Sequence, residues 1–316
     1  MSAKTIGAAV SNILLATDGS ASAREAESFA LMMATAYDAR VDALSVLEFE
    51  PGQDLEYDVN RRYLEDRRRE IREQGAALAQ RAEAAGIKIE WHESVGMPSR
   101  EIIALAERSR HDLVVVGTHG RTGFEYVLIG STAERVVRGA PCPVVTVRGA
   151  SAAGREPASA VKGATERGLA KLLVAVDFSD CGRSAVEYAV QLADRFGSEV
   201  TLLHVAEPVA YGLDFTLRHA LTGPAFRKQC EESIAQLAGL FSGRGLSARH
   251  DVRSGVPGDV IQLVAGERGS DAIVMGTHGR RGWSQIRFGS VAESVIRHAD
   301  CPVFTVRSPK FRNASS

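Results

Sequence analysis

The sequence has few cysteines, and they are not spaced as in a disulfide framework or a zinc site. The four stand singly, at positions 142, 181, 230 and 301, with no C-x-x-C pair and no tight cysteine–histidine cluster. Disulfide-rich secreted domains and zinc ribbons show the opposite pattern. A reduced, cytoplasmic protein is therefore expected. Cys142 and Cys301 precede the last apolar run of each half, where burial as a small apolar group is favoured over a redox role.

Long hydrophobic runs and an excess of one charge are also absent. The formal net charge is −1, with 45% hydrophobic and 24% charged residues, as in ordinary globular proteins. This balance gives no sign of a nucleic-acid partner or of an anionic membrane surface. No apolar run approaches the ~18–20 residues that span a bilayer. The N-terminal sequence MSAKTIGAAVSN lacks the apolar segment of a secretory signal. We expect neither a membrane partner nor a nucleic-acid partner.

What the sequence does contain is one long segment written twice. Residues 112–148 and 271–307 match in order and spacing, from a buried apolar run through a glycine loop to a second apolar run. The first loop glycines, Gly117 and Gly276, are 159 positions apart (276 − 117). The same offset relates the aspartates that end the first apolar run of each half. A constant offset along the chain predicts two domains of one fold, each of about 150 residues.

The stretch between the two halves has the composition of a linker. Residues 150–168 are rich in Ala, Gly and Ser and lack hydrophobic periodicity. The predicted domains are therefore residues 1–149 and residues 169–316, joined by that segment.

Each half alternates short apolar runs with longer segments of helical periodicity. In the first half the apolar runs are residues 12–17, 41–47, 87–95, 113–116 and 144–147. The run at 113–116 has no polar alternation, which is typical of a strand buried on both faces of a parallel sheet. Strands that alternate with helices predict right-handed crossovers and helices on both faces. The fold class is therefore α/β, with two tandem doubly wound parallel sheets.

Several residues predict where helices begin. The capping-box pattern S-x-x-E occurs at Ser22 and again at Ser131, so helices are expected to open there. Pro98 suits the first turn of a helix. In the second half, Ser179 or Asp180 is the expected cap of the first helix.

A glycine loop and a helix start follow the buried run at residues 113–116. The loop opens with Gly117-x2-Gly120, and Gly130 and Ser131 come after nine further residues. Glycines let backbone N–H groups approach an anion. A helix start adds unpaired donors and the positive end of its dipole. The pattern therefore predicts a phosphate site.

An aspartate follows the first strand of each half. In doubly wound sheets a ligand lies beyond the carboxyl ends of the strands. If strands one and four are neighbours, Asp18 faces Gly117 there and Asp177 faces Gly276. A carboxylate suits ribose hydroxyls, so phosphate and sugar recognition together indicate a nucleotide. The sequence has no Walker A loop, and no G-x-G-x-x-G follows its first strand, which argues against an ordinary dinucleotide dehydrogenase.

Simpler interpretations stand beside these. Asp18 and Asp177 could merely cap the helices that follow them. His119 and His278 could be metal ligands or general bases. No second histidine or carboxylate lies at a suitable spacing, so loop packing or contact of their backbone with a ligand is favoured.

On these residues the sequence resembles the universal stress protein family. That family's ATP-binding signature is G-x2-G-x9-G-[ST], and it is intact in both halves. The residues that carry it are Gly117, Gly120, Gly130 and Ser131, and again Gly276, Gly279, Gly289 and Ser290. Because the resemblance covers nearly the whole chain outside the linker and the tail, the chain is identified as a tandem member.

The resemblance implies a Rossmann-like fold with strand order 3-2-1-4-5, and ATP, with or without Mg²⁺, as the ligand. It places the aspartate after strand one and a residue near the end of strand two around the adenosine. The phosphates would meet backbone N–H groups after the cap serine. The implied positions outside the signature are Asp18, Val46, Val116, His119 and Thr132, and Asp177, Val205, Met275, His278 and Val291. No catalytic residue and no metal ligand is predicted.

The resemblance also implies pairing through the fifth strand. In a tandem chain that pairing is expected internally, between residues 144–147 and 303–306. A homodimer is kept as an alternative. The expected function is a nucleotide-binding regulatory protein with little or no turnover. The alternatives are a slow ATPase or autophosphorylating enzyme, against which the lack of a clear acid–base pair argues, and an interaction module without ligand. The complete signature in both halves argues against the latter.

Overall fold

The computed structural model describes residues 10–48, 58–118, 130–149, 168–207, 224–277 and 289–308. These residues fall into two compact units, the first ending at residue 149 and the second beginning at residue 168.

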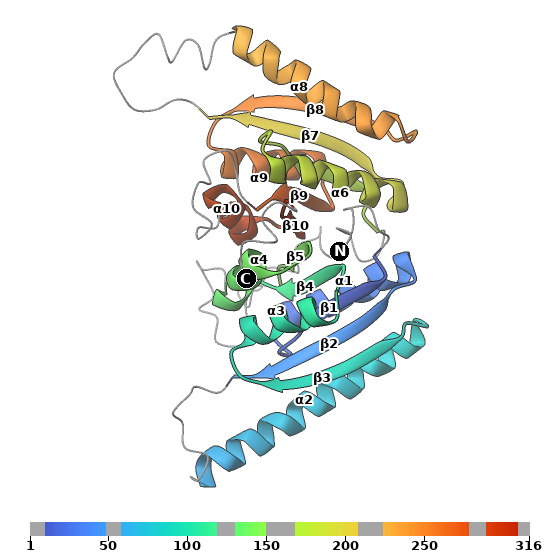
Figure 1. The fold of residues 1–316 in the computed structure, drawn as a ribbon, viewed down its shortest axis with the longest axis vertical. Coiled ribbons are helices and arrows are strands. Elements are labelled where there is room, and N and C mark those ends of the chain that lie inside the picture. The colour runs from blue at the N-terminus through green and yellow to red at the C-terminus, as the bar shows by residue number, and fades with distance from the viewer. Residues whose placement is uncertain are drawn as a thin grey trace, which may run out of the picture. The chain divides into compact units, whose positions relative to one another are not determined.

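The first unit is a five-stranded parallel sheet with helices between its strands (Figure 1). Its elements are β1 (Asn12–Ala16), α1 (Ala21–Tyr37), β2 (Arg40–Leu47), α2 (Asp58–Ala84), β3 (Ile89–Val95), α3 (Pro98–Arg108), β4 (Leu113–Gly117), α4 (Ser131–Gly139) and β5 (Val144–Val147). The strands lie in the order β3-β2-β1-β4-β5.

The second unit repeats this plan. Its elements are β6 (Lys171–Ala175), α6 (Asp180–Phe196), β7 (Glu199–Ala206), α8 (Pro224–Ser242), β8 (Ala248–Ser254), α9 (Pro257–Arg268), β9 (Ala272–Gly276), α10 (Ser290–His298) and β10 (Val303–Val306). The order β8-β7-β6-β9-β10 is that of the first unit, strand for strand. The predicted fold class and the strand order 3-2-1-4-5 are confirmed.

Burial explains why these runs form strands. Residues Leu113–Val116 of β4 are buried on both faces, and so are Ile13–Leu15 of β1. Helices α3 and α4 pack against each other, as do α6 with α8 and α9 with α10, whereas α2 packs on β2 and β3. Helices that return in opposite directions across a right-handed doubly wound sheet cover opposite faces, which buries both.

The central strand pair is held at its start by one carboxylate. Asp112, directly before β4, accepts hydrogen bonds through Oδ2 from the backbone N–H of Ser11 at 3.0 Å and of Asn12 at 3.1 Å. In the second unit Asp271 accepts from the N–H of Lys171 at 2.8 Å. These contacts fix the register in which β1 lies beside β4.

Two of the predicted helix caps are wrong by one or two residues. Ser20, rather than Ser22, is the N-cap of α1, because its side chain accepts from the N–H of Ala23. The N-cap of α4 is Gly130, without any side-chain cap, so Ser131 is the first helical residue and no capping box forms. The other expectations hold: Pro98 opens α3 and Ser179 caps α6.

All four cysteines are free and buried, as expected for Cys142 and Cys301. Burial raises the pKa of the Cys301 thiol to about 12, and the charge of Asp300 adds to the shift. Both effects disfavour the thiolate, which is the reactive form.

Across the described ranges, no helix combines the length and the apolar character needed to cross a bilayer.

Candidate functional site at the carboxyl ends of the strands

The strand register brings the two predicted halves of the site to one edge of the sheet. Ala16, the last residue of β1, pairs with Val116 of β4 on one side and with Leu44 of β2 on the other. Asp18 follows two residues after Ala16, and Gly117 follows Val116 directly. The adjacency of strands one and four, on which the predicted crevice depends, is therefore present. Ala175 and Met275 pair in the same way in the second unit.

The aspartate after the first strand shapes the turn into α1. Oδ1 of Asp18 accepts from the backbone N–H of Ser20 at 3.0 Å, and Gly19 between them has a left-handed φ of 74°. This is an Asx turn, in which the side chain replaces a backbone acceptor. In the second unit, Oδ1 of Asp177 accepts from both the N–H and the hydroxyl of Ser179, at 3.0 and 2.6 Å. Neither aspartate is the helix cap that the simpler interpretation suggested.

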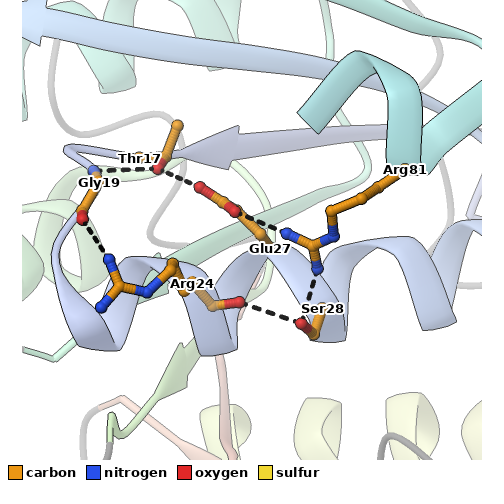
Figure 2. A network of polar contacts seen from close by, with 6 residues as sticks. All are labelled: Thr17, Gly19, Arg24, Glu27, Ser28 and Arg81. Carbon is orange, nitrogen blue, oxygen red and sulfur yellow. Dashed lines mark hydrogen bonds and ion pairs between the residues drawn. The ribbon is translucent and has the colours of Figure 1, made fainter. Parts of the chain in front are cut away.

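A partly buried polar network ties this turn to the helices beside it (Figure 2). The carboxylate of Glu27 accepts from Thr17 Oγ1 at 2.7 Å and from Arg81 Nη1 at 2.9 Å. The Thr17 oxygen also accepts from the N–H of Gly19 at 3.4 Å, and Arg24 donates to the Gly19 carbonyl at 3.0 Å. The turn that carries the aspartate is thus tied to α1 and, through Arg81, to α2. This network was not predicted, because its ion pair joins residues 54 positions apart.

The start of α4 lies at the end of β4. The N–H of Gly130 donates to the carbonyl of Thr118 at 2.8 Å, and in the second unit the N–H of Gly289 donates to that of Thr277 at 3.2 Å. Neither helix has a side-chain cap. Among the described residues, their first N–H groups therefore lack the side-chain acceptor that Ser20 supplies at α1, as a helix start that binds an anion requires.

The first loop glycine has a packing role that the sequence did not reveal. A Cβ atom on Gly117 would lie 2.8 Å from Ser22 Oγ and 3.1 Å from the backbone nitrogen of Ala23. On Gly276 it would lie 2.8 Å from the carbonyl carbon of Cys181. Each glycine is therefore needed where the end of the fourth strand meets the first helix of its unit, apart from any ligand.

The remaining predicted residues line the same edge where the structure describes them. Val46 and Val205 are near the ends of β2 and β7 and are half-buried. The residues before the loop glycines, Val116 and Met275, are buried, and the second residues of α4 and α10, Thr132 and Val291, are half-buried. The loop residues His119, Gly120, His278 and Gly279 lie outside the described residues.

The two units differ beside this turn. Where the first unit has Gly19, the second has Phe178, which adopts the same left-handed conformation with φ 60°. Its ring packs on His204 with centroids 4.5 Å apart, and Nδ1–H of His204 donates to the Val176 carbonyl at 2.7 Å. His204 was not predicted, although it directly precedes the predicted Val205. Phe178 also lines a cavity of about 380 Å³ that extends along α8 past Cys230.

Comparison with known proteins agrees with the duplicated fold. The family model described as the universal stress protein family matches the chain twice, at residues 10–148 and 169–307. A universal stress protein from Methanocaldococcus jannaschii is 36% identical over 137 residues, which are 43% of this chain and 81% of that protein. One from Mycobacterium tuberculosis is 27% identical over 250 residues, which are 77% of this chain and 78% of that protein.

A solved structure shows the same fold over both units. The crystal structure of a universal stress protein from Archaeoglobus fulgidus has a TM-score of 0.69 and 24% identity, covering 94% of this chain and 98% of that one.

Proposed function

Since this chain belongs to the universal stress protein family, we propose that it binds ATP at the carboxyl ends of the strands in both units. In this proposal nucleotide binding is regulatory: it stabilises one state of a stress-response protein, and turnover is slow or absent.

The observation that carries the proposal is the closure at the base of the glycine loop. The bond from Gly130 to Thr118 brings the uncapped start of α4 to the end of β4, and Gly289 and Thr277 repeat it. Because strand β4 is next to β1, the helix start shares an edge with Asp18. A backbone donor set beside a carboxylate fits the phosphates and the ribose of a nucleotide.

In the proposed sites the phosphates lie over the starts of α4 and α10, and the adenosine lies toward β1 and β2 of the first unit or β6 and β7 of the second. The residues assigned to binding are those of the sequence prediction: Asp18, Val46, Val116, Gly117, His119, Gly120, Gly130, Ser131 and Thr132, and Asp177, Val205, Met275, Gly276, His278, Gly279, Gly289, Ser290 and Val291. Mg²⁺ would accompany the phosphates.

Slow turnover follows from how the aspartates are used. Asp18 and Asp177 both accept hydrogen bonds from the turn that they shape, which favours a positioning role over that of a general base. With ATP and Mg²⁺, phosphate release is expected to stay far below the roughly 1–10³ per second of ordinary enzymes. Release at several per second would contradict this part of the proposal.

Equilibrium dialysis with labelled ATP tests the binding. The full chain is expected to take up two nucleotides. Gly130→Glu and Gly289→Glu form a matched pair, since each puts a carboxylate at one helix start and leaves the other untouched. Each variant is expected to bind one nucleotide, and the double variant none. Circular dichroism shows whether each variant is folded.

Two results would overturn the proposal. One is the absence of saturable uptake by the wild-type chain, and the other is uptake of two nucleotides by the folded double variant.

The organisation of the chain is part of the same proposal. We assign residues 1–149 and 169–316 to the two domains and 150–168 to the linker, with internal pairing through the fifth strands. A homodimer is the alternative assembly.

A further inference from the structure

A cluster of acidic and histidine side chains lies in the first unit, away from the crevice. Asp42 is near the start of β2, and Glu90 and His92 are in β3. In the parallel register Asp42 pairs with Glu90, and His92 follows two residues later. Side chains alternate along a strand, so all three project from the same face of the sheet.

The three side chains converge without hydrogen bonding to one another. Nε2 of His92 is 3.9 Å from Asp42 Oδ1 and 3.8 Å from Glu90 Oε1, both beyond hydrogen-bond range. One ligand atom from each residue lies within 4.8 Å of the others. The His92 Nε2 atom is buried and has no hydrogen-bond partner in the part of the chain that the structure describes. Burying such a nitrogen without a partner is costly.

These separations are close to those of a metal site. A tetrahedral ion with bonds of 2.0–2.1 Å holds its ligands roughly 3.3 Å apart. The two gaps to His92 Nε2 therefore need to close by about half an ångström around an ion, and the gap between the two carboxylate oxygens, which is at most 4.8 Å, by up to about 1.5 Å. The Glu90 side chain is 73% exposed, so it can make this adjustment by rotating.

His111 holds the buried member of the cluster in place. Its side chain is fully buried, and Nε2–H donates to Asp42 Oδ2 at 2.8 Å. The other carboxylate oxygen is the one nearest His92. In metal sites such an outer hydrogen bond fixes the orientation of a ligand before the ion arrives.

In the part of the chain that the structure describes, no arginine or lysine lies within ion-pair distance of these two carboxylates. Among the described residues, Asp42 and Glu90 form ion pairs with histidines alone. The nearest arginine on β2, Arg40, donates to the side-chain oxygen of Asn12 at 3.1 Å. Two carboxylates side by side, with no arginine or lysine of the described residues in direct ion-pair contact, favour a bound positive ion.

We propose that Asp42, Glu90 and His92 bind one divalent first-row transition ion such as Zn²⁺, and that His111 is a positioning residue for Asp42. One imidazole nitrogen and two carboxylate oxygens suit such an ion and leave a position for water. The proposal does not rest on nucleotide binding, because these residues are not part of the crevice.

The second unit supplies an internal comparison. With the offset of 159, Asp42 corresponds to Thr201 (42 + 159), Glu90 to Arg249 (90 + 159) and His92 to Asp251 (92 + 159). A threonine, an arginine and a single carboxylate cannot hold the ion, so one ion per chain is expected.

Titration of the full chain with Zn²⁺ by calorimetry, without nucleotide, tests the site. Wild-type protein is expected to bind one equivalent of Zn²⁺. The variants His92→Gln and Glu90→Gln are expected to bind it at least tenfold more weakly. His250→Gln is the control, because it removes an exposed histidine from the second unit. Its affinity is expected to stay within about twofold of wild type. Co²⁺ added in place of Zn²⁺ should give visible absorption bands that the two cluster variants lose.

The role of His111 is tested by a pair of variants. His111→Gln keeps an N–H that reaches Asp42 and is expected to keep the Zn²⁺ affinity within about threefold, whereas His111→Leu weakens it about tenfold or more. If the folded variants His111→Gln and His111→Leu bind Zn²⁺ with equal affinity, His111 has no positioning role.

The site itself is overturned if no equivalent of Zn²⁺ binds, or if folded His92→Gln binds it as tightly as wild type. Gly130→Glu separates this result from the proposed function, since it is expected to lose one nucleotide and keep the Zn²⁺ equivalent.

Discussion

Glu27 shows how one buried charge depends on its partners. Its side chain is 9% exposed and is held by Thr17, directly after β1, and by Arg81 from α2. At the corresponding positions, offset by 159, the second unit has Val176, Val186 and Leu240, all apolar. The same fold therefore tolerates either a complete polar network or an apolar one. This is expected, because a network that lacks one partner leaves a buried polar group unpaired and lowers stability most.

We predict that Arg81→Leu alone lowers the stability of the chain by about 1–3 kcal/mol, because it leaves the buried Glu27 carboxylate without its cation. The triple variant Thr17→Val, Glu27→Val, Arg81→Leu copies the second unit and is expected to lie within about 1 kcal/mol of wild type. Guanidinium unfolding followed by circular dichroism measures both. If the triple variant is as unstable as Arg81→Leu, the prediction is wrong, and the polar network stabilises the fold more than apolar residues at the same positions do.

Burial also decides the chemistry of the cysteines. With a pKa of about 12, the thiolate of Cys301 is scarce near neutral pH, and its environment is closed to reagents. We predict that native protein at pH 8 gives no rapid reaction with a thiol reagent, and that all four cysteines react after unfolding in guanidinium. Ser242→Cys, at an exposed position, is the control for reagent activity. Mass spectrometry that finds Cys301 labelled in native protein would contradict the prediction.

At the scale of elements, glycines that look alike in the sequence have different neighbours. Gly117 ends β4 directly against the backbone of α1, whereas Gly266 lies inside α9, where a Cβ atom would have no neighbour within 4 Å. The first is glycine because of close packing. The second is a helical glycine whose extra backbone freedom in the unfolded chain costs stability.

We therefore predict opposite effects of one substitution. Gly117→Ala should lower stability by about 1–3 kcal/mol through overpacking against Ser22, and Gly266→Ala should raise it by about 0.5–1 kcal/mol. Thermal unfolding of the two variants beside wild type measures the difference. If Gly117→Ala is as stable as wild type and loses only nucleotide binding, the glycine serves the ligand rather than the packing.

The elements themselves were predictable from the sequence, and their exact starts were not. Unalternated apolar runs such as Leu113–Val116 can be buried only within a covered sheet, so strands and fold class followed from them. The strand order came from the family resemblance. The N-cap positions of α1 and α4 were mispredicted because the S-x-x-E pattern does not determine at which residue the helix begins. The Asx turn of Asp18 places the cap at Ser20, and the bond to Thr118 places it at Gly130.

The candidate site was predicted only in part, because some of its residues carry a local sequence pattern and others do not. Asp18 and Gly117 are marked by their positions after strands, so their common edge follows once β1 and β4 are neighbours. Thr17, Glu27 and Arg81 carry no local pattern, and the cluster of Asp42, Glu90 and His92 joins two strands. Contacts between residues so far apart in sequence arise only from the folded structure.

At the scale of the whole molecule, duplication conserved the base of the loop and varied what surrounds it. Both units keep the hydrogen bond that closes the loop and the glycine that packs on the first helix. The buried network, the turn residue at Gly19 or Phe178, and the acidic cluster each differ between units. Two sites with the same backbone geometry and different surrounding side chains are expected to bind the same ligand with different affinities. The binding isotherm from equilibrium dialysis should therefore show two steps.

The proposed pairing of the fifth strands predicts a pattern of amide exchange in the full chain. β5 is the last strand in the order of the first unit, and β10 is the last in the second. In an edge strand of a parallel sheet, alternate N–H groups point away from the neighbouring strand and exchange quickly, as expected in β3 at the other edge. If β5 and β10 pair internally, all the amides of Val144–Val147 and Val303–Val306 should exchange slowly, and equally so at low and high protein concentration. Alternate fast amides in β5, or protection that disappears on dilution, would favour an open edge or a homodimer instead.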